Sequence, residues 1–203
     1  MMSGAEKPGP FRLRLASSSP RRRALLSELG WELEVLSPDV DETRLEGESP
    51  EALCERLSCL KAAACAGDGE TPVVAADTIV VVEGRVLGKP EDRQEAKEML
   101  RLLQGRTHEV MTGVAVFWRG RVVSCVERTA VTFRPLSEDD VDRYAASGEG
   151  DDKAGAYAIQ GRGALLVSGI SGDYFNVVGL PLCRLGRMME SLGINLSIMW
   201  GAS

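Results

Sequence analysis

The stretch VVAADTIVVV, residues 73–82, constrains this chain more than any other part of its sequence. Its length and its β-branched residues predict a strand that is buried on both faces. Asp77 nevertheless lies near its middle, and an unpaired charge in such surroundings costs several kcal/mol, a large part of a domain's net stability. Asp77 therefore needs a compensating partner. Three roles are open for it: general base, metal ligand, or partner in a buried salt bridge.

Asp77 and Thr78 are consecutive in this predicted strand. In a regular strand their side chains point to opposite faces of the sheet. We therefore expect only one of them to face a given cleft unless a β-bulge intervenes.

Hydrophobic periods and capping residues assign the other elements. Strand patterns cover residues 11–16, 31–36, 108–118 and 121–133, and helix patterns cover residues 20–29, 50–66, 91–105, 137–148 and 181–192. Parallel-type βα units are mixed with a long hairpin, which predicts an α/β fold with a mixed sheet flanked by helices. We expect one domain over residues 11–195, with a flexible N-terminal tail of residues 1–10 and a C-terminal tail of residues 196–203.

Composition excludes several classes of protein. The net charge of −6 argues against binding to a nucleic acid polymer, which depends on a basic surface. No apolar run approaches the length of a membrane span, and the first residues lack an apolar signal region, so we expect a cytoplasmic protein without a membrane partner. The five cysteines show no zinc-binding spacing, which favours thiols in a reducing compartment.

The segment SSSPRR, residues 17–22, predicts a phosphate site at the start of a helix. Ser19 fits the N-cap and Pro20 the first helical position. A helix N-terminus offers free N–H groups and a positive partial charge. Arginines crowd here in an otherwise acidic chain: Arg12, Arg14, Arg21, Arg22 and Arg23. The alternative is an ordinary helix cap with solvated arginines.

Two lysines and an acidic loop add further candidates. Lys61 and Lys89 lie in small or apolar settings and carry compact charges on long stems, which suits contact with phosphate. The alternative for each lysine is a structural role, in which the stem packs on apolar surface and the ammonium group reaches solvent. Asp39, Asp41 and Glu42 offer the oxygen ligands that magnesium or manganese prefers, or are solvated acids.

The segment EGDDKAGAYAIQGRGA, residues 149–164, is too rich in glycine and charge to predict a regular element. A loop of this length in a compact domain is usually functional or disordered. Its polar candidates include Asp152, Lys153 and Gln160. The amide of Gln160 offers one donor and one acceptor side by side.

Known catalytic motifs are otherwise missing. His108 is the only histidine and is expected to be structural, and no GxSxG, Walker or GxGxxG motif occurs in the required context. Metal-assisted hydrolysis of a phosphorylated small molecule is the reaction class that remains.

Eight motifs, in order, resemble the Maf family of nucleoside triphosphate pyrophosphatases: LASSSPRR, PDVDE, LKA, AADTIVV, LGKP, HEVMTGVAV, DKAGAYAIQG and YFNVVGLP. The resemblance spans about residues 13–193. It implies cleavage between the α- and β-phosphates of a non-standard or surplus nucleotide, which gives the monophosphate and pyrophosphate. It also implies a divalent metal, Mg²⁺ or Mn²⁺, and an inosine-triphosphate-pyrophosphatase-like fold, an elongated mixed sheet with a central cleft between two lobes.

The resemblance assigns roles to individual residues. Asp77 falls on the family's proton acceptor, Lys61 and Lys89 on its essential lysines, and Glu42 joins Asp77 at the metal. The expected substrate-binding residues are Ser17, Ser19, Arg21, Arg22, Thr78, Lys153 and Gln160. Among these, Arg21, Thr78 and Gln160 match positions linked to base selection.

The segment DKAGAYAIQG resembles the branch that acts on dTTP and UTP, with CTP and modified pyrimidine nucleotides as further candidates. Ala158 departs from the glycine of many relatives. Three alternatives stay open: a 7-methyl-GTP pyrophosphatase, a phosphatase that removes the γ-phosphate, and a nucleotide-binding regulator of cell division. The expected partner is a nucleoside triphosphate, and the family suggests a homodimer.

Overall fold

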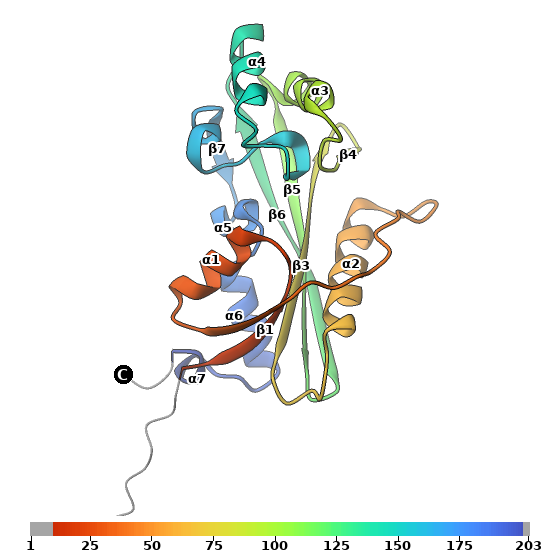
Figure 1. The fold of residues 1–203 in the computed structure, drawn as a ribbon, viewed down its shortest axis with the longest axis vertical. Coiled ribbons are helices and arrows are strands. Elements are labelled where there is room, and N and C mark those ends of the chain that lie inside the picture. Colours follow the sequence, from red (N-terminus) through yellow and green to blue (C-terminus); the bar gives the residue numbers. More distant parts are fainter. Residues whose placement is uncertain (1–9, 201–203) are drawn as a thin grey trace, which may run out of the picture.

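The computed structural model describes residues 10–200, which form a seven-stranded mixed sheet flanked by helices (Figure 1). The order is β2-β1-β3-β5-β6-β7, and β4 also pairs with β3. β1 pairs in parallel with β2 and β3, whereas the other pairs are antiparallel. The predicted mixed α/β fold is therefore confirmed. The strands are β1 (Arg12–Ala16), β2 (Glu32–Leu36), β3 (Val73–Val82), β4 (Arg85–Leu87), β5 (Thr107–Trp118), β6 (Arg121–Phe133) and β7 (Val167–Ser171).

Capping side chains fix the starts of several helices. Ser19 and Ser137 are N-caps, as the sequence predicts, and their hydroxyls accept bonds from backbone N–H groups of the first turn. The helices are α1 (Pro20–Glu28), α2 (Pro50–Ala64), α3 (Arg93–Leu103), α4 (Glu138–Ala146), α5 (Tyr174–Val178), α6 (Leu182–Ser191) and α7 (Leu196–Met199). None of the helices in residues 10–200 combines the length and apolar character needed to cross a membrane.

Both chain ends bear on the expected tails. Residues 1–9 of the expected N-terminal tail lie outside the described residues. Residues 196–199 differ from the expected C-terminal tail, because they form α7 and bury Met199 in the core. The indole Nε1 of Trp31 donates a hydrogen bond to the carbonyl oxygen of Met199 at 2.7 Å. A four-residue helix is too short to show a hydrophobic period in the sequence.

Two groups of helices cover one face of β3. Val74 and Ala76 pack with α1 and α6, whereas Val80 and Val82 pack with α3 and α4 nearer the other end of the long strands (Figure 1). Thr78 lies between these two groups along the strand. α2 covers the opposite face, where it packs on Ile79 and other residues. The middle of β3 therefore lies between the two helical groups.

One edge of β3 is only partly paired. β5 pairs with the other edge along residues 73–81. On the partly paired edge, β1 pairs with residues 73–75 and β4 pairs with residues 80–82. Within the described chain, residues 76–79 therefore have no strand partner on this edge. Both faces of β3 can be reached through the opening.

His108 lies in the core, in agreement with the structural role expected from the sequence. It is 2% exposed, its Nε2 lies 2.8 Å from the hydroxyl oxygen of Tyr157, and its ring meets Phe133 edge-on. Burial lowers the pKa of His108 from 6.5 to about 4. The neutral imidazole is therefore the form that the folded protein favours.

We expect this histidine to destabilise the protein in mild acid. Between pH 6.5 and about 4 the unfolded chain protonates its histidine while the folded protein does not. The contribution of His108 to the free energy of unfolding is therefore fully present above pH 6.5. It falls by about 3 kcal/mol in total as the pH drops toward 4. Urea unfolding of the wild type and of His108→Gln across this range measures the difference. Parallel pH dependences would contradict the assignment.

Candidate active site

A cleft of about 510 Å³ opens at the unpaired edge of β3, a volume typical of small-molecule sites. It brings together all the residues predicted for the site: Ser17, Ser19, Arg21, Arg22, Glu42, Lys61, Asp77, Thr78, Lys89, Lys153 and Gln160. Asp39 and Asp41, the other acids of the metal-candidate loop, are exposed and do not line the cleft.

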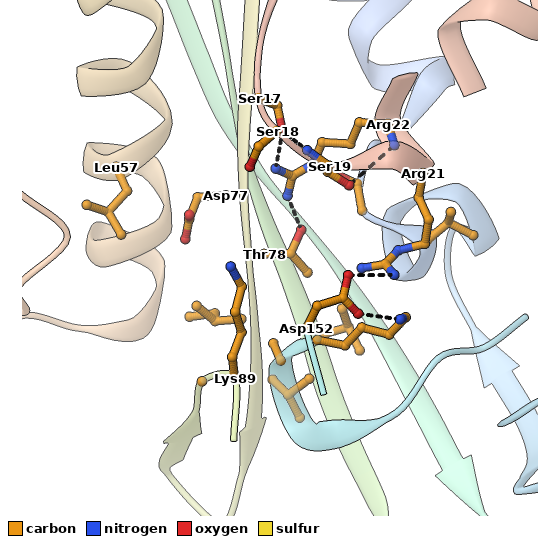
Figure 2. A pocket seen from close by; sticks show the side chains of 18 of the residues that line it. Ser17, Ser18, Ser19, Arg21, Arg22, Leu57, Asp77, Thr78, Lys89 and Asp152 are labelled. Atoms are coloured by element: carbon orange, nitrogen blue, oxygen red, sulfur yellow. Dashed lines mark hydrogen bonds and ion pairs between the residues drawn. The ribbon is translucent and has the colours of Figure 1, made fainter. Parts of the chain in front are cut away.

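Asp77 and Thr78 both reach this cleft, from opposite faces of β3 (Figure 2). The strand is regular here, because Asp77 pairs with Gly113 and Thr78 with Thr112 in an unbroken register. The expectation that only one of the two would face the cleft without a bulge is therefore wrong. The cleft extends around the open edge between β1 and β4, so side chains on both faces line it.

Lys61 provides the compensating charge that Asp77 requires. Its Nζ lies 2.6 Å from Oδ1 of Asp77 and 2.7 Å from Oε1 of Glu42. The side chains of Lys61 and Asp77 are only 11% and 13% exposed. In such a setting, paired charges are far less costly than a single one.

A glycine allows α2 to approach close enough for this contact. Gly113 lies opposite Asp77 on β5, and a Cβ atom there would lie 2.1 Å from the carbonyl oxygen of Cys54 in α2. Any side chain at position 113 would push α2 away from the sheet. The reach of Lys61 to Asp77 thus depends on this glycine.

The start of α1 is held in place by its own serines. Oγ of Ser17 accepts hydrogen bonds from the backbone N–H of Ser19 at 3.2 Å and from Nη1 of Arg22 at 3.1 Å. Oγ of Ser19 accepts from the backbone N–H of Arg22 at 3.4 Å. The helix N-terminus that the sequence predicts for phosphate contact is therefore fixed before any ligand binds.

Arg22 acts mainly within the protein. Its Nε donates to the carbonyl oxygen of Gly179 at 2.8 Å, its Nη1 to that of Ala76 at 2.8 Å, and its Nη2 to Oγ1 of Thr78 at 2.9 Å. With the bond to Ser17, four of the five guanidinium N–H groups have protein acceptors. Burial lowers the pKa of Arg22 to about 10, so it stays charged at neutral pH. One N–H group remains for the substrate contact predicted from the sequence.

The other cations of the cleft are Arg21, Lys89 and Lys153. Nη1 of Arg21 is 3.8 Å from Oδ2 of Asp152, whose Oδ1 is 2.5 Å from Nζ of Lys153 (Figure 2). Lys89 lines the cleft, extends toward Asp77, and makes no ion pair with the described residues (Figure 2). An incoming anion would thus meet one available lysine and two cations that share a single carboxylate.

The acids of the cleft fit a divalent metal only in part. The described residues contain no group of three His, Cys, Asp or Glu side chains suited to a metal ion. Glu42 and Asp77 do approach one common point, because both contact Lys61. Mg²⁺ often binds through one or two carboxylates together with substrate phosphates. The pair therefore fits an ion whose remaining ligands come from a phosphorylated substrate and water.

Two residues that shape the cleft are not among the predicted site residues. Gly113 carries the signal of a glycine inside a strand pattern, which often marks close backbone approach. Asp152 belongs to the polar loop noted in the sequence, but its position beside Arg21 depends on the meeting of distant segments. Only the fold reveals what these two residues contact.

Together, a carboxylate beside a buried cation, a fixed helix N-terminus and an available lysine define a site for a phosphorylated ligand. The chain belongs to the Maf-like protein family, whose model matches residues 12–192. The family resemblance of the sequence motifs is thereby confirmed.

Curated relatives match over almost their full length. A protein of Moorella thermoacetica named dTTP/UTP pyrophosphatase is 51% identical over 193 residues, which cover 94% of this chain and 98% of the relative. A protein of Pelotomaculum thermopropionicum with the same name is 51% identical over 185 residues, covering 90% and 97%. A solved nucleoside-triphosphatase / dITP/XTP pyrophosphatase from Mycobacterium abscessus is 17% identical, covers 90% of this chain and 97% of its own, and has a TM-score of 0.45.

Proposed function

We propose that the protein hydrolyses nucleoside triphosphates, with dTTP and UTP as preferred substrates, to the monophosphate and pyrophosphate. The observation that carries the proposal is the carboxylate of Asp77, held 2.6 Å from Lys61 at the open edge of β3 and facing a cleft with an available Lys89. The names of relatives that are about half identical to this chain support the choice of substrate.

In the proposed reaction Asp77 accepts a proton from a water molecule that attacks the α-phosphorus. The bond between the α-phosphorus and the bridging oxygen breaks, and that oxygen leaves with pyrophosphate. Lys61 orients the carboxylate of Asp77. Lys89 and the positive end of the α1 dipole stabilise the developing charge, and a donor placed for this purpose is typically worth about a hundredfold or more.

Glu42 and Asp77 are the proposed holders of a divalent ion, Mg²⁺ or Mn²⁺. Both carboxylates contact the same ammonium group, so they are close enough to share a cation with bound phosphates. When bound, the ion supplies neutralisation of phosphate charge and polarisation of the P–O bonds.

Gln160 is the residue that we propose recognises the nucleobase. It is exposed on the wall of the cleft, whereas the hydroxyl of Thr78 is already engaged by Arg22 and Thr112. The amide of Gln160 can pair with N3–H and O4 of uracil or thymine, and cytosine reverses this pattern. Arg21 lines the same cleft, with its Nη1 3.8 Å from Oδ2 of Asp152 in the segment that carries Gln160, and it contributes positive charge there.

A nucleotide panel tests the function. We expect pyrophosphate from dTTP and UTP in the presence of Mg²⁺, slower release from CTP and from 7-methyl-GTP, and little release with EDTA. Orthophosphate as the first product would identify a γ-phosphatase instead, and preference for 7-methyl-GTP would move the protein to the other branch. Tight binding without turnover would favour the regulator of cell division.

The cytoplasmic location, the homodimer and the single domain over residues 11–195 stay predictions. Light scattering on the purified protein measures the oligomeric state. A monomer at micromolar concentration would overturn the expected homodimer.

A further inference from the structure

The segment 149–163, which carries Lys153 and Gln160, is organised around the side chain of Glu149. Oε1 of Glu149 accepts hydrogen bonds from the hydroxyl of Tyr144 at 3.1 Å and from the backbone N–H of Gly163 at 2.9 Å. Oε2 accepts from the backbone N–H of Arg162 at 3.0 Å. One carboxylate therefore joins the first residue of the segment to its last two.

Tyr144 extends this connection to the middle of the segment. Its hydroxyl donates to Glu149 and accepts from the backbone N–H of Ala158 at 3.0 Å. Nζ of Lys153 donates to the carbonyl oxygen of Glu149 at 2.5 Å. Glu149 therefore holds the backbone on both sides of Gln160, directly or through Tyr144. It also holds the ammonium group of Lys153.

Two glycines allow the segment to wrap this closely. A Cβ at Gly161, where φ is +64°, would lie 2.7 Å from Oε2 of Glu149. A Cβ at Gly163 would lie 1.9 Å from the carbonyl oxygen of Ala158. Gly161 is therefore required by close packing against the carboxylate, and Gly163 by close packing against the backbone of Ala158.

These hydrogen-bond donors stabilise the ionised form of Glu149. Burial raises the pKa of Glu149, but hydrogen bonds from the N–H groups of Gly163 and Arg162 and from Tyr144, together with the charge of Lys153, outweigh burial and hold that pKa below its usual value. Glu149 does not line the cleft, so it acts on a ligand only through the segment that it holds.

We propose that Glu149 is a positioning residue for nucleotide recognition, which places Gln160 and Lys153 on the wall of the cleft. This inference rests on the proposed hydrolysis of pyrimidine nucleoside triphosphates. Charge-assisted bonds from two backbone N–H groups and a tyrosine fix the segment more firmly than its glycine-rich sequence alone would allow.

The test uses Glu149→Gln with Glu138→Gln as the matched control, because Glu138 is exposed on α4 and, within the described part of the chain, forms an ion pair with Arg101 alone. A glutamine has one acceptor oxygen, so donors on one side of the former carboxylate lose their partner. We expect KM for UTP to rise about tenfold with kcat changed less than about threefold, and the UTP over CTP preference to fall about tenfold. Hydrogen exchange of residues 150–163 should accelerate in Glu149→Gln and not in the control Glu138→Gln.

Tyr144→Phe provides a second variant that keeps the buried ring. It removes the bridge between Glu149 and Ala158, so we expect a smaller change in the same direction. The double variant should be little worse than Glu149→Gln, because both changes break one connected network.

The outcomes separate the two proposals. Wild-type protein that releases no pyrophosphate from any nucleotide would overturn the proposed function. If the wild type is active, faster exchange in Glu149→Gln with unchanged KM and unchanged preference would reduce Glu149 to a structural residue. Unchanged exchange would show that it does not hold the segment at all.

Discussion

Replacement of Asp77 with asparagine is expected to lower pyrophosphate release by about a thousandfold, since general-base contributions of this kind span about 10²–10⁴. The amide has the shape of the carboxylate but cannot take a proton from water. Lys61 retains Glu42 at 2.7 Å, so the variant does not leave a buried ammonium group without a partner. The fold should therefore persist.

Asp139→Asn is the control for this substitution. Asp139 is exposed on α4, where Arg143 is its one ion-pair partner among residues 10–200, so its amide variant should hydrolyse dTTP at the wild-type rate. Steady-state rates and circular dichroism on both variants separate lost chemistry from lost structure. Near-wild-type turnover by Asp77→Asn would remove Asp77 from the mechanism.

Loss of the Arg22 guanidinium is expected to produce the largest fall in stability. Arg22→Ala deprives acceptors on four residues of a donor: Ser17, Ala76, Thr78 and Gly179. Oγ of Ser17 keeps its bond from the backbone N–H of Ser19, and the hydroxyl of Thr78 keeps Thr112. The carbonyl oxygens of Ala76 and Gly179 lose the donor, and a buried acceptor without a partner costs about 1–3 kcal/mol, so the free energy of unfolding should fall by at least about 2 kcal/mol. Arg22→Lys should recover only part of this loss, because an ammonium group lacks the planar fork of arginine.

Arg23→Ala is a closely matched control, because Arg23 is the next residue of α1 and is exposed. Its free energy of unfolding should stay within about 0.5 kcal/mol of the wild-type value, as is usual for surface substitutions. Denaturant unfolding measures both variants. Equal stability of the Arg22 and Arg23 variants would show that the bonds of Arg22 do not hold the cleft together.

Local signals in the sequence predict much of the fold. Ser19 and Pro20 mark the start of α1, and the apolar run of residues 73–82 becomes β3 with the same bounds. α5 has only five residues, which is too short to show a hydrophobic period. Its start is set by Asp173, whose side chain accepts hydrogen bonds from two backbone N–H groups. Short helices set by one cap are therefore the part that a periodic pattern misses.

The open edge of β3 could not be predicted, because it depends on where two other strands stop. β1 ends its pairing at Ala75 and β4 begins its pairing at Val80. Neither limit is encoded within β3 itself. The alternation of side chains in that strand gives the directions of Asp77 and Thr78 correctly, but not the cleft that reaches both.

The residue types in the sequence predict which side chains gather at the site. They do not predict which atoms each side chain contacts. Arginine at a helix N-terminus indicates phosphate binding, and Arg21 and Arg22 do line the cleft. The bonds of Arg22 to Ala76 and Gly179 join segments far apart in the chain. In the sequence Glu149 is one acid of a polar loop. Only the fold shows that backbone N–H groups of the same segment donate to its carboxylate.

The position of the bond that water breaks tests the central claim most directly. Hydrolysis of dTTP in water enriched in ¹⁸O, followed by mass spectrometry of both products, reports which phosphorus atom is attacked. Attack on the α-phosphorus within the Asp77 cleft predicts one ¹⁸O atom in the thymidine monophosphate and none in the pyrophosphate. Label in the pyrophosphate, or release of labelled orthophosphate, would contradict it.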